Sequence, residues 1–264
     1  MKKLVKLKSI LKGMGSVLLA YSGGVDSTFL LRVAKDVLGK NVLAVTADSP
    51  TYPQDELKFS CRTARAMGVR HKVIRTQEDK NPLFRANPQN RCYYCKKELF
   101  SRLKKIATQE KIKFVVDASN ISDQADFRPG SRAKKELGAR SPLAEARFTK
   151  EDIRRESKKL GLVTWQKPSL ACLASRVPYG TKITPVILSK IEKAENIIKS
   201  LGFGQVRVRH YNRSCRIEVD KLSLPKLLAK QNLFVEKLKT LGYNYITVDL
   251  EGYRTGSMNL KKRG

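Results

Sequence analysis

Residues 16–28 decide the fold of this chain and read SVLLAYSGGVDST. An apolar run ends at Ser22, two glycines follow, and a helical pattern begins near Ser27. A buried strand that passes through glycines into a helix points backbone N–H groups and a helix N-terminus at one place, which favours an anion. Gly23 and Gly24 carry no Cβ atom, so the chain can turn sharply and approach a phosphate closely.

Three polar side chains complete the loop. Ser22 and Ser27 supply hydroxyl groups, and Asp26 is expected to cap the helix or to orient a magnesium-bound group. An ordinary glycine-rich turn is the alternative, but the whole hexapeptide is more specific than two glycines. The Gly-Lys-Ser/Thr of a Walker loop is not part of it.

Strand and helix patterns alternate through the first half of the chain. Apolar runs at 16–22, 41–48, 70–74 and 113–119 alternate with helical patterns, among them 27–38 and 54–67. This alternation predicts right-handed βαβ units and a doubly wound, mostly parallel sheet of α/β class, which binds ligands at the carboxyl ends of its strands.

Two acidic residues follow predicted strands. Asp48 ends the run at 41–48 and is a further candidate for nucleotide binding, and Asp123 follows the strand at 113–119 as a candidate metal ligand. The alternative for Asn120 and Asp123 is that they are turn and cap residues.

A second pattern begins after residue 183. A helix near 185–201, strands at 205–211 and 215–220, a helical stretch near 224–241 and a strand at 245–250 predict a small α+β domain. We therefore expect a nucleotide-binding domain at residues 1–183 and a substrate-binding or oligomerisation domain at 184–264. Segment 166–185, QKPSLACLASRVPYGTKITP, lacks periodicity and is expected to be an exposed functional loop.

The chain is strongly basic. Its 54 Lys and Arg against 24 Asp and Glu give a net charge of +30, which favours anionic partners such as nucleotides, phosphates or RNA. The basic residues are scattered, so a charged surface of the kind seen in heat-adapted proteins explains them as well as nucleic-acid binding does. No apolar run is long enough for a membrane span, and we expect a cytoplasmic protein rather than a secreted one.

Five cysteines are too few for a disulfide scaffold, and their odd number argues against full pairing. Cys92 and Cys95 lie three positions apart at the start of a helical stretch, so both thiols can face one point. The neighbouring Arg91, Lys96 and Lys97 favour thiolates.

Cys172 is the obvious third thiol. Three thiolates on an iron–sulfur cluster leave one iron open to a further sulfide or substrate. A zinc site completed by Cys61, Cys215 or a histidine is the alternative. We interpret Cys61 and Cys215 as small buried apolar residues instead.

Arg207 and Arg209 alternate along a predicted strand, so their side chains share one side of the sheet. Two guanidinium groups on one face can bind a phosphate or a carboxylate. A solvated surface pair is the alternative.

These motifs resemble known proteins at two levels. Ser22–Ser27 resembles the PP-loop signature of GMP synthetase, NAD synthetase, asparagine synthetase and tRNA-thiolating enzymes. SGGVDSTFLL (22–31), NRCYYCKKELF (90–100), CLASRVPYGTKIT (172–184), VRVRHYNRSCRIEV (206–219) and DLEGYRTGSMN (249–259) together resemble the LarE family of sulfurtransferases, over nearly the whole chain.

The LarE resemblance implies a reaction and its cofactors. ATP, with Mg²⁺, adenylates a carboxylate of pyridinium-3,5-biscarboxylic acid mononucleotide and releases pyrophosphate, and sulfur then displaces AMP, a step of nickel-pincer cofactor synthesis. In some members the cysteine equivalent to Cys172 gives up its own sulfur. Others hold a 4Fe–4S cluster on three cysteines, and Cys92 and Cys95 place this chain with them.

The resemblance also assigns residues and partners. Arg207 and Arg209 correspond to the residues that hold the substrate phosphate, with Ser175 and Arg176 assisting. A homo-oligomer is expected by analogy. A tRNA-thiolating enzyme of the same superfamily is the main alternative, although the sequence has no separate RNA-binding module.

Overall fold

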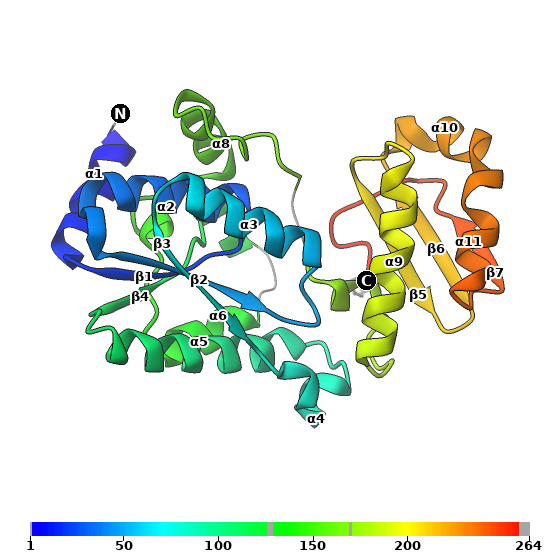
Figure 1. Ribbon diagram of the computed structural model, residues 1–264, viewed down its shortest axis with the longest axis horizontal. Coiled ribbons are helices and arrows are strands. Elements are labelled where there is room, and N and C mark those ends of the chain that lie inside the picture. Colours follow the sequence, from blue (N-terminus) through cyan, green and yellow to red (C-terminus); the bar gives the residue numbers. More distant parts are fainter. Residues whose placement is uncertain (1, 126–128, 169–170, 259–264) are drawn as a thin grey trace. The chain divides into compact units, whose positions relative to one another are not determined.

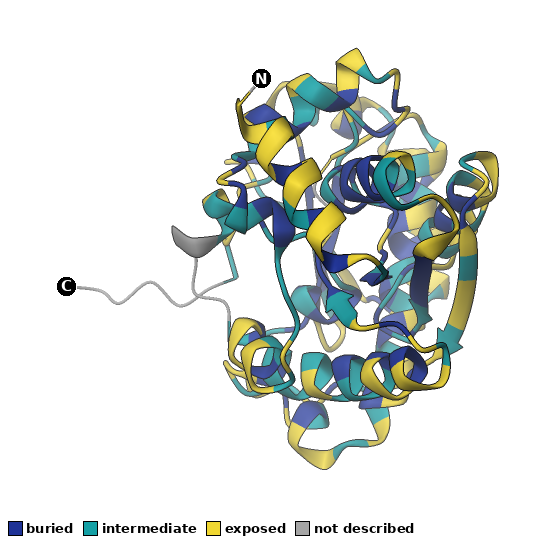
Figure 2. Cartoon of the chain, turned by 90° about the vertical axis from the view of Figure 1, so that its left-hand side faces the viewer, coloured by how far each residue is buried: buried dark blue, intermediate teal, exposed yellow. Residues whose placement is uncertain are grey.

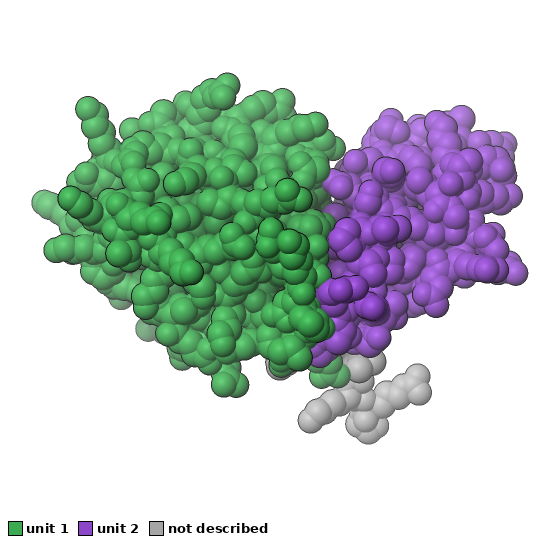
Figure 3. All heavy atoms as spheres, turned by 60° about the horizontal axis from the view of Figure 1, so that its bottom comes forward, with its two compact units in different colours: residues 1–84, 89–170 green, residues 85–88, 171–264 purple. Residues whose placement is uncertain are grey.

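The protein is described by a computed structural model over residues 2–125, 129–168 and 171–258. The chain forms two compact units, residues 1–84 with 89–170 and residues 85–88 with 171–264 (Figure 3). Each unit has its own hydrophobic core. The expected division into domains 1–183 and 184–264 stays a prediction.

Unit 1 is built on a parallel sheet. Its strands are β1 (Val17–Ala20), β2 (Val42–Asp48), β3 (Arg70–Arg75) and β4 (Phe114–Val116), in the order β3-β2-β1-β4. Helices cover both faces (Figure 1). The predicted doubly wound α/β sheet is confirmed.

Alternation along β1 explains the two covered faces. Val17 and Leu19 lie in one core with side chains of α1 (Lys2–Met14), α2 (Val25–Leu38) and α3 (Gln54–Ala66). Leu18 lies in a second core with side chains of α5 (Arg91–Gln109). Exposed residues lie on the outer surfaces of the helices (Figure 2).

Shorter elements connect the sheet to the rest of unit 1. They are η1 (Gly39–Asn41), η2 (Glu78–Lys80), α4 (Pro82–Arg85), η3 (Ile121–Ala125), α6 (Gly130–Glu136), α7 (Pro142–Glu145) and α8 (Lys150–Lys159). A capping box begins α8, because the Thr149 hydroxyl accepts from the Asp152 N–H and the Asp152 carboxylate accepts from the Thr149 N–H.

Strand order places the candidate loops together. The chain runs from β1 to β2 and β3 on one side and then crosses to β4 on the other side of β1, so the strand order reverses between β1 and β4. Such a switch point is where open α/β sheets bind ligands. The 22–27 loop follows β1 and the Asp117–Asp123 segment follows β4, which places both at this point.

Unit 2 contains a mixed sheet. Its helices are α9 (Pro185–Ser200), α10 (Leu224–Ala229) and α11 (Val235–Thr240), and its strands are β5 (Val206–Tyr211), β6 (Ser214–Val219) and β7 (Tyr245–Val248). β5 pairs with β6 antiparallel, and β6 pairs with β7 parallel. Short turns η4 (Leu173–Arg176), η5 (Lys221–Ser223) and η6 (Gln231–Leu233) complete the unit.

Two expectations about unit 2 are wrong. The helical stretch at 224–241 is broken, because the chain makes the η6 turn and Phe234 adopts a non-helical φ of −130°. Segment 166–185, of which residues 169 and 170 lie outside the described residues, is also not a fully exposed loop, since Leu173, Val177 and Ile183 are buried.

Asn87 explains how this irregular segment can be buried. Its side chain, wholly buried itself, donates to the carbonyls of Pro178 at 2.7 Å and Thr181 at 3.0 Å. Buried backbone groups outside helices and sheets need such partners. Asn87 and Pro178 are 91 positions apart in the sequence, so the spacing of apolar residues does not reveal that they interact.

Within the described ranges, no helix is long and apolar enough to cross a lipid bilayer.

Candidate nucleotide and cysteine sites

The loop after β1 requires glycine at position 23. Gly23 has φ +61°, and a Cβ atom there would lie 2.8 Å from Ser60 Cβ and 3.1 Å from Ser60 Cα. Ser60 is completely buried on α3 and cannot move away. Gly24 differs, since its φ is −79° and a Cβ atom there would meet the Ser22 hydroxyl at an ordinary 3.5 Å.

The serine hydroxyls close the loop on itself. Ser22 Oγ and Ser27 Oγ are 3.1 Å apart, and Ser27 Oγ donates to the Gly24 carbonyl at 3.1 Å. The Ser22 N–H donates to Ser27 Oγ at 3.3 Å. In this structure the two hydroxyls therefore shape the loop, and their use as ligand donors stays a prediction.

Asp26 pairs with a lysine and does not cap the helix. Lys150 Nζ donates to Asp26 Oδ2 at 2.5 Å. Oδ1 is buried, and no group in the described part of the chain hydrogen-bonds to it. Burial raises the pKa of Asp26, Lys150 opposes this, and the charge of Asp123 adds to the rise.

The acidic loop after β4 supplies further oxygens. Asp123 Oδ2 accepts from the Asn120 N–H at 3.2 Å. Asn120 is completely buried, and neither of its side-chain polar atoms has a partner among the described residues. Carboxylate and amide oxygens are suitable magnesium ligands, so Asp26, Asn120 and Asp123 fit that ion chemically.

Asp48 lies at the carboxyl end of β2, two strands from the acidic loop. Its Oδ1 accepts from Gln54 Nε2 at 3.1 Å. Its nucleotide-binding role stays a prediction.

Two contacts to the loop were missed by the sequence analysis. The Tyr52 hydroxyl donates to the Ser22 carbonyl at 2.6 Å, and Lys167 Nζ donates to the Gly23 carbonyl at 3.2 Å. Neither residue belongs to a motif, and both bonds are long-range in sequence. Only the tertiary structure reveals them.

Cys92 and Cys95 occupy the first turns of α5, as predicted, and both are half-buried. Cys95 Sγ lies 3.9 Å from Glu78 Oε1. This carboxylate is buried and also accepts from the hydroxyls of Ser49 and Thr51. No motif marks Glu78 in the sequence, because it lies in the charged stretch 77–80.

Cys172 belongs to unit 2 and is half-buried. Arg176 Nη1 donates to the carbonyls of Ala171 at 2.6 Å and Cys172 at 3.0 Å. The same guanidinium, completely buried, pairs with both carboxylate oxygens of Glu195. Arg176 therefore fixes the backbone at Cys172.

The remaining two cysteines differ from each other. Cys215 is completely buried, as expected, and burial raises its pKa to about 12. Cys61 is half-buried on α3, so its interpretation as a core residue is wrong. In the described ranges, no group of three or more His, Cys, Asp or Glu side chains is arranged to hold a metal ion. The grouping of Cys92, Cys95 and Cys172 stays a prediction.

Arg207 and Arg209 are not a solvated surface pair, since each is only 4% exposed. Arg209 forms a two-pronged ion pair with Glu218 and donates to the Ser175 carbonyl at 3.2 Å. Arg207 lies 5.1 Å from the Tyr253 ring centre. Burial, and then the charge of Arg176, lower the pKa of Arg207, so an anion beside Arg207 would be stabilised.

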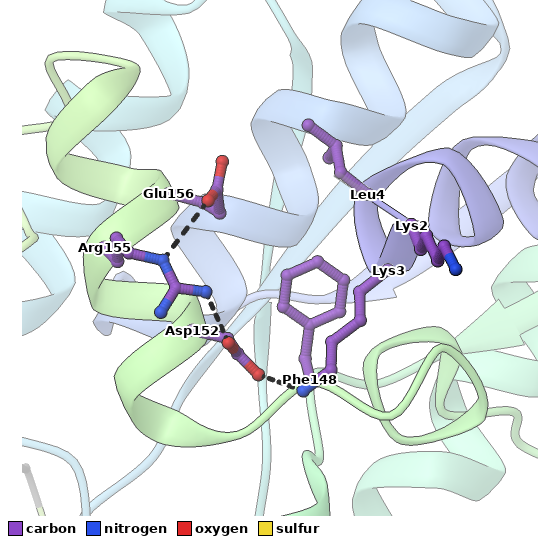
Figure 4. A pocket seen from close by; sticks show the side chains of 7 residues that line it. All are labelled: Lys2, Lys3, Leu4, Phe148, Asp152, Arg155 and Glu156. Carbon is purple, nitrogen blue, oxygen red and sulfur yellow. Dashed lines mark hydrogen bonds and ion pairs between the residues drawn. The ribbon is translucent and has the colours of Figure 1, made fainter.

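A surface hollow of about 280 Å³ lies elsewhere in unit 1 (Figure 4). It is lined by Lys2, Lys3, Leu4, Phe148, Asp152, Arg155 and Glu156. The ion pairs of Asp152 with Lys3 and Arg155 cross it, joining α1 to α8 and bracing α8. None of the loop or cysteine residues lines it, and we assign it to helix packing.

Comparison with known proteins identifies the family of this chain. The asparagine synthase family model matches residues 10–87, which include the 22–27 loop. The pyridinium-3,5-bisthiocarboxylic acid mononucleotide synthase of Lactiplantibacillus plantarum is 37% identical over 258 residues, covering 97% of this chain and 94% of its own. The chain belongs to the LarE family.

Two further proteins share this LarE-family sequence along its length. An uncharacterized protein of Synechocystis sp. is 42% identical over 259 residues, covering 97% of both chains. An uncharacterized protein of Methanocaldococcus jannaschii is 31% identical over 262 residues, covering 97% of this chain and 98% of its own. The likeness therefore covers both compact units.

Gly23→Ala should destabilise the protein and weaken ATP binding. A positive φ and the contact with Ser60 together cost about 1–3 kcal/mol, and relief of that strain would rotate the loop's N–H groups. Gly24→Ala is the matched control for stability, because its φ is ordinary and its surroundings have room. Thermal unfolding and ATP titration measure both effects, and normal ATP affinity in Gly23→Ala would contradict this account of the loop.

Asp26→Asn should abolish ATP-dependent turnover without lowering thermal stability. Because the pKa of Asp26 is raised by folding, its ionised form opposes folding above that raised pKa. This cost disappears as the pH falls through the raised pKa toward the unfolded value near 4. The variant's Tm should equal or exceed that of the wild type at pH 7, with the difference closing toward pH 4. A Tm several degrees lower at pH 7 would instead show that the carboxylate is structural.

Proposed function

We propose that this LarE-family chain uses ATP to activate a carboxylate of pyridinium-3,5-biscarboxylic acid mononucleotide and then transfers sulfur to the activated carbon. The observation that carries the proposal is the 22–27 loop at the switch point of the sheet, with the buried Asp26 Oδ1 beside it. The name of the L. plantarum relative, a bisthiocarboxylic acid mononucleotide synthase, supports the substrate class.

The two steps balance without an outside oxidant. A carboxylate oxygen of the substrate attacks the α-phosphorus of ATP, and pyrophosphate leaves with the electrons of the broken P–O bond. A sulfur nucleophile then attacks the carboxyl carbon, and AMP leaves as a phosphate anion, giving a thiocarboxylate. AMP is a far better leaving group than a carboxylate oxygen, which is the reason for using ATP.

The loop and the acidic residues support the first step. The Gly23 and Gly24 N–H groups and the N-terminus of α2 attract the phosphates. Asp26 and Asp123 would hold Mg²⁺, which neutralises phosphate charge when bound. Lys150 keeps Asp26 in place through its ion pair.

We assign the sulfur chemistry to Cys92, Cys95 and Cys172. We propose that these thiols bind a 4Fe–4S cluster, which when bound supplies an open iron for an additional sulfide. Two thiols one turn apart on α5 fit such a ligand set.

The buried arginines divide between two roles in this proposal. Arg207, a buried guanidinium whose pKa is lowered mainly by burial, binds the phosphate of the mononucleotide together with Arg209. Arg176 and Ser175 position the cysteine segment, because Arg176 holds the Ala171 and Cys172 carbonyls. Assembly into a homo-oligomer is also part of the proposal, by analogy with the family.

Mass analysis after incubation with ATP and the dicarboxylated mononucleotide tests sulfur transfer. Anaerobically prepared wild type should add sulfur to the substrate, and Cys172→Ser should not. Cys92→Ser should lose bound iron and acid-labile sulfide, which are measured independently of activity. Cys61→Ser is the matched control and should keep both.

Two results of that experiment would contradict the proposal. Iron-free protein that is fully active, with Cys172 lighter by one hydrogen sulfide, would show that Cys172 gives up its own sulfur. Sulfur addition to tRNA but not to the mononucleotide would favour the tRNA-thiolating alternative.

Steady-state kinetics separate the roles of the arginines. Arg207→Met should raise the KM for the mononucleotide at least about tenfold, the effect of losing one charge-assisted contact, and leave the KM for ATP unchanged. Arg176→Met should instead lower stability by about 3–5 kcal/mol, because it leaves Glu195 buried and unpaired. Arg213→Met, on the exposed β5–β6 turn, is the control. An unchanged KM for the mononucleotide in Arg207→Met would remove Arg207 from the substrate site.

A further inference from the structure

The carbonyl groups of two successive loop residues are held by side chains distant in sequence. The Tyr52 hydroxyl donates to the Ser22 carbonyl at 2.6 Å. Lys167 Nζ donates to the Gly23 carbonyl at 3.2 Å. The next carbonyl, of Gly24, belongs to the α2 helix, where it accepts from the Thr28 N–H at 2.9 Å.

Holding a carbonyl also fixes an N–H group. The chain has no cis peptide bonds in its described part, and in a planar trans peptide the C=O and N–H bonds point in opposite directions. Tyr52 therefore sets the direction of the Gly23 N–H, and Lys167 sets that of the Gly24 N–H. Within the described residues, neither N–H has a hydrogen-bond acceptor of its own.

Lys167 is itself held in place. Its Nζ lies 2.6 Å from Glu56 Oε2 and 3.5 Å from the centre of the Phe59 ring. Its side chain is only 16% exposed. Burial lowers the pKa of Lys167 and the ion pair with Glu56 opposes this, while the bonds to Glu56 and to the Gly23 carbonyl together fix the position of Nζ.

The supports converge from one side of the loop. Glu56, Phe59 and Ser60 lie on α3, and Tyr52 lies just before that helix. Ser60 fills the space beside Gly23, so the glycine backbone rests directly on α3. Peptide groups held in this way lose little further freedom when an anion binds.

We propose that Tyr52 and Lys167 are positioning residues that aim the Gly23 and Gly24 N–H groups at the phosphates of the nucleotide. This inference rests on the proposed function only in taking the 22–27 loop as the phosphate site. Both residues act through the loop backbone and do not touch the ligand.

Calorimetric titration with inorganic pyrophosphate and, separately, with adenosine tests the inference. Tyr52→Phe removes one oxygen, and Lys167→Met removes the charge but keeps the stem. Each substitution should raise the Kd for pyrophosphate about tenfold, the equivalent of one hydrogen bond, while the Kd for adenosine stays within about twofold of the wild-type value. Lys167→Arg keeps a donor and should restore part of the affinity.

Two control variants match the test variants. Lys35→Met removes a lysine that donates to the Gly68 carbonyl at 2.9 Å, away from the loop. Tyr93→Phe removes a hydroxyl that donates to Glu136 at 2.7 Å. Neither should change the Kd for pyrophosphate. Thermal unfolding checks that every variant folds. If Lys167→Met does not fold, Tyr52→Phe alone tests the inference.

The outcomes separate this inference from the proposed function. Unchanged pyrophosphate affinity in folded Tyr52→Phe would overturn the inference. Loss of pyrophosphate affinity in Lys167→Met but not in Tyr52→Phe would also overturn it, because Lys167 would then be a direct phosphate ligand. Wild type that binds neither pyrophosphate nor ATP would overturn the proposed function, and this inference with it.

Discussion

The contact between Gly23 and Ser60 is the constraint on which the phosphate loop depends. A positive φ at Gly23 turns the chain from β1 toward α2, and the absence of a Cβ atom lets the backbone lie against α3. Ser60 is completely buried, so this packing ties the loop conformation to the hydrophobic core. The core of unit 1 thereby determines where the N–H groups of residues 23 and 24 point.

Charge is distributed to match this arrangement. Asp26 carries one carboxylate oxygen on Lys150 and one that no described residue hydrogen-bonds, and burial raises its pKa. In unit 2, Arg176 and Arg209 are balanced by Glu195 and Glu218, whereas the pKa of Arg207 is lowered. A carboxylate oxygen that accepts no hydrogen bond and a buried cation are both stabilised by ligands of opposite charge, which is typical of binding sites.

Local sequence predicted those parts that depend on neighbouring residues. The strand–loop–helix at 16–28 and the alternation of strands with helices in unit 1 follow from short-range patterns, and the structure has them. Tyr52, Glu78 and Lys167 escaped detection, because they reach the sites across 17 to 144 positions of sequence. Segment 166–185 was misjudged for the same reason, since its burial depends on Asn87 in a distant part of the chain.

In the proposed reaction, a substrate carboxylate attacks the α-phosphate of ATP held at the 22–27 loop. Mass analysis of AMP formed from ATP and a mononucleotide with oxygen-18 in its carboxylates tests this directly. The account predicts that AMP carries one oxygen-18 atom taken from the substrate, with unlabelled pyrophosphate. Unlabelled AMP, or ADP as the nucleotide product, would contradict it.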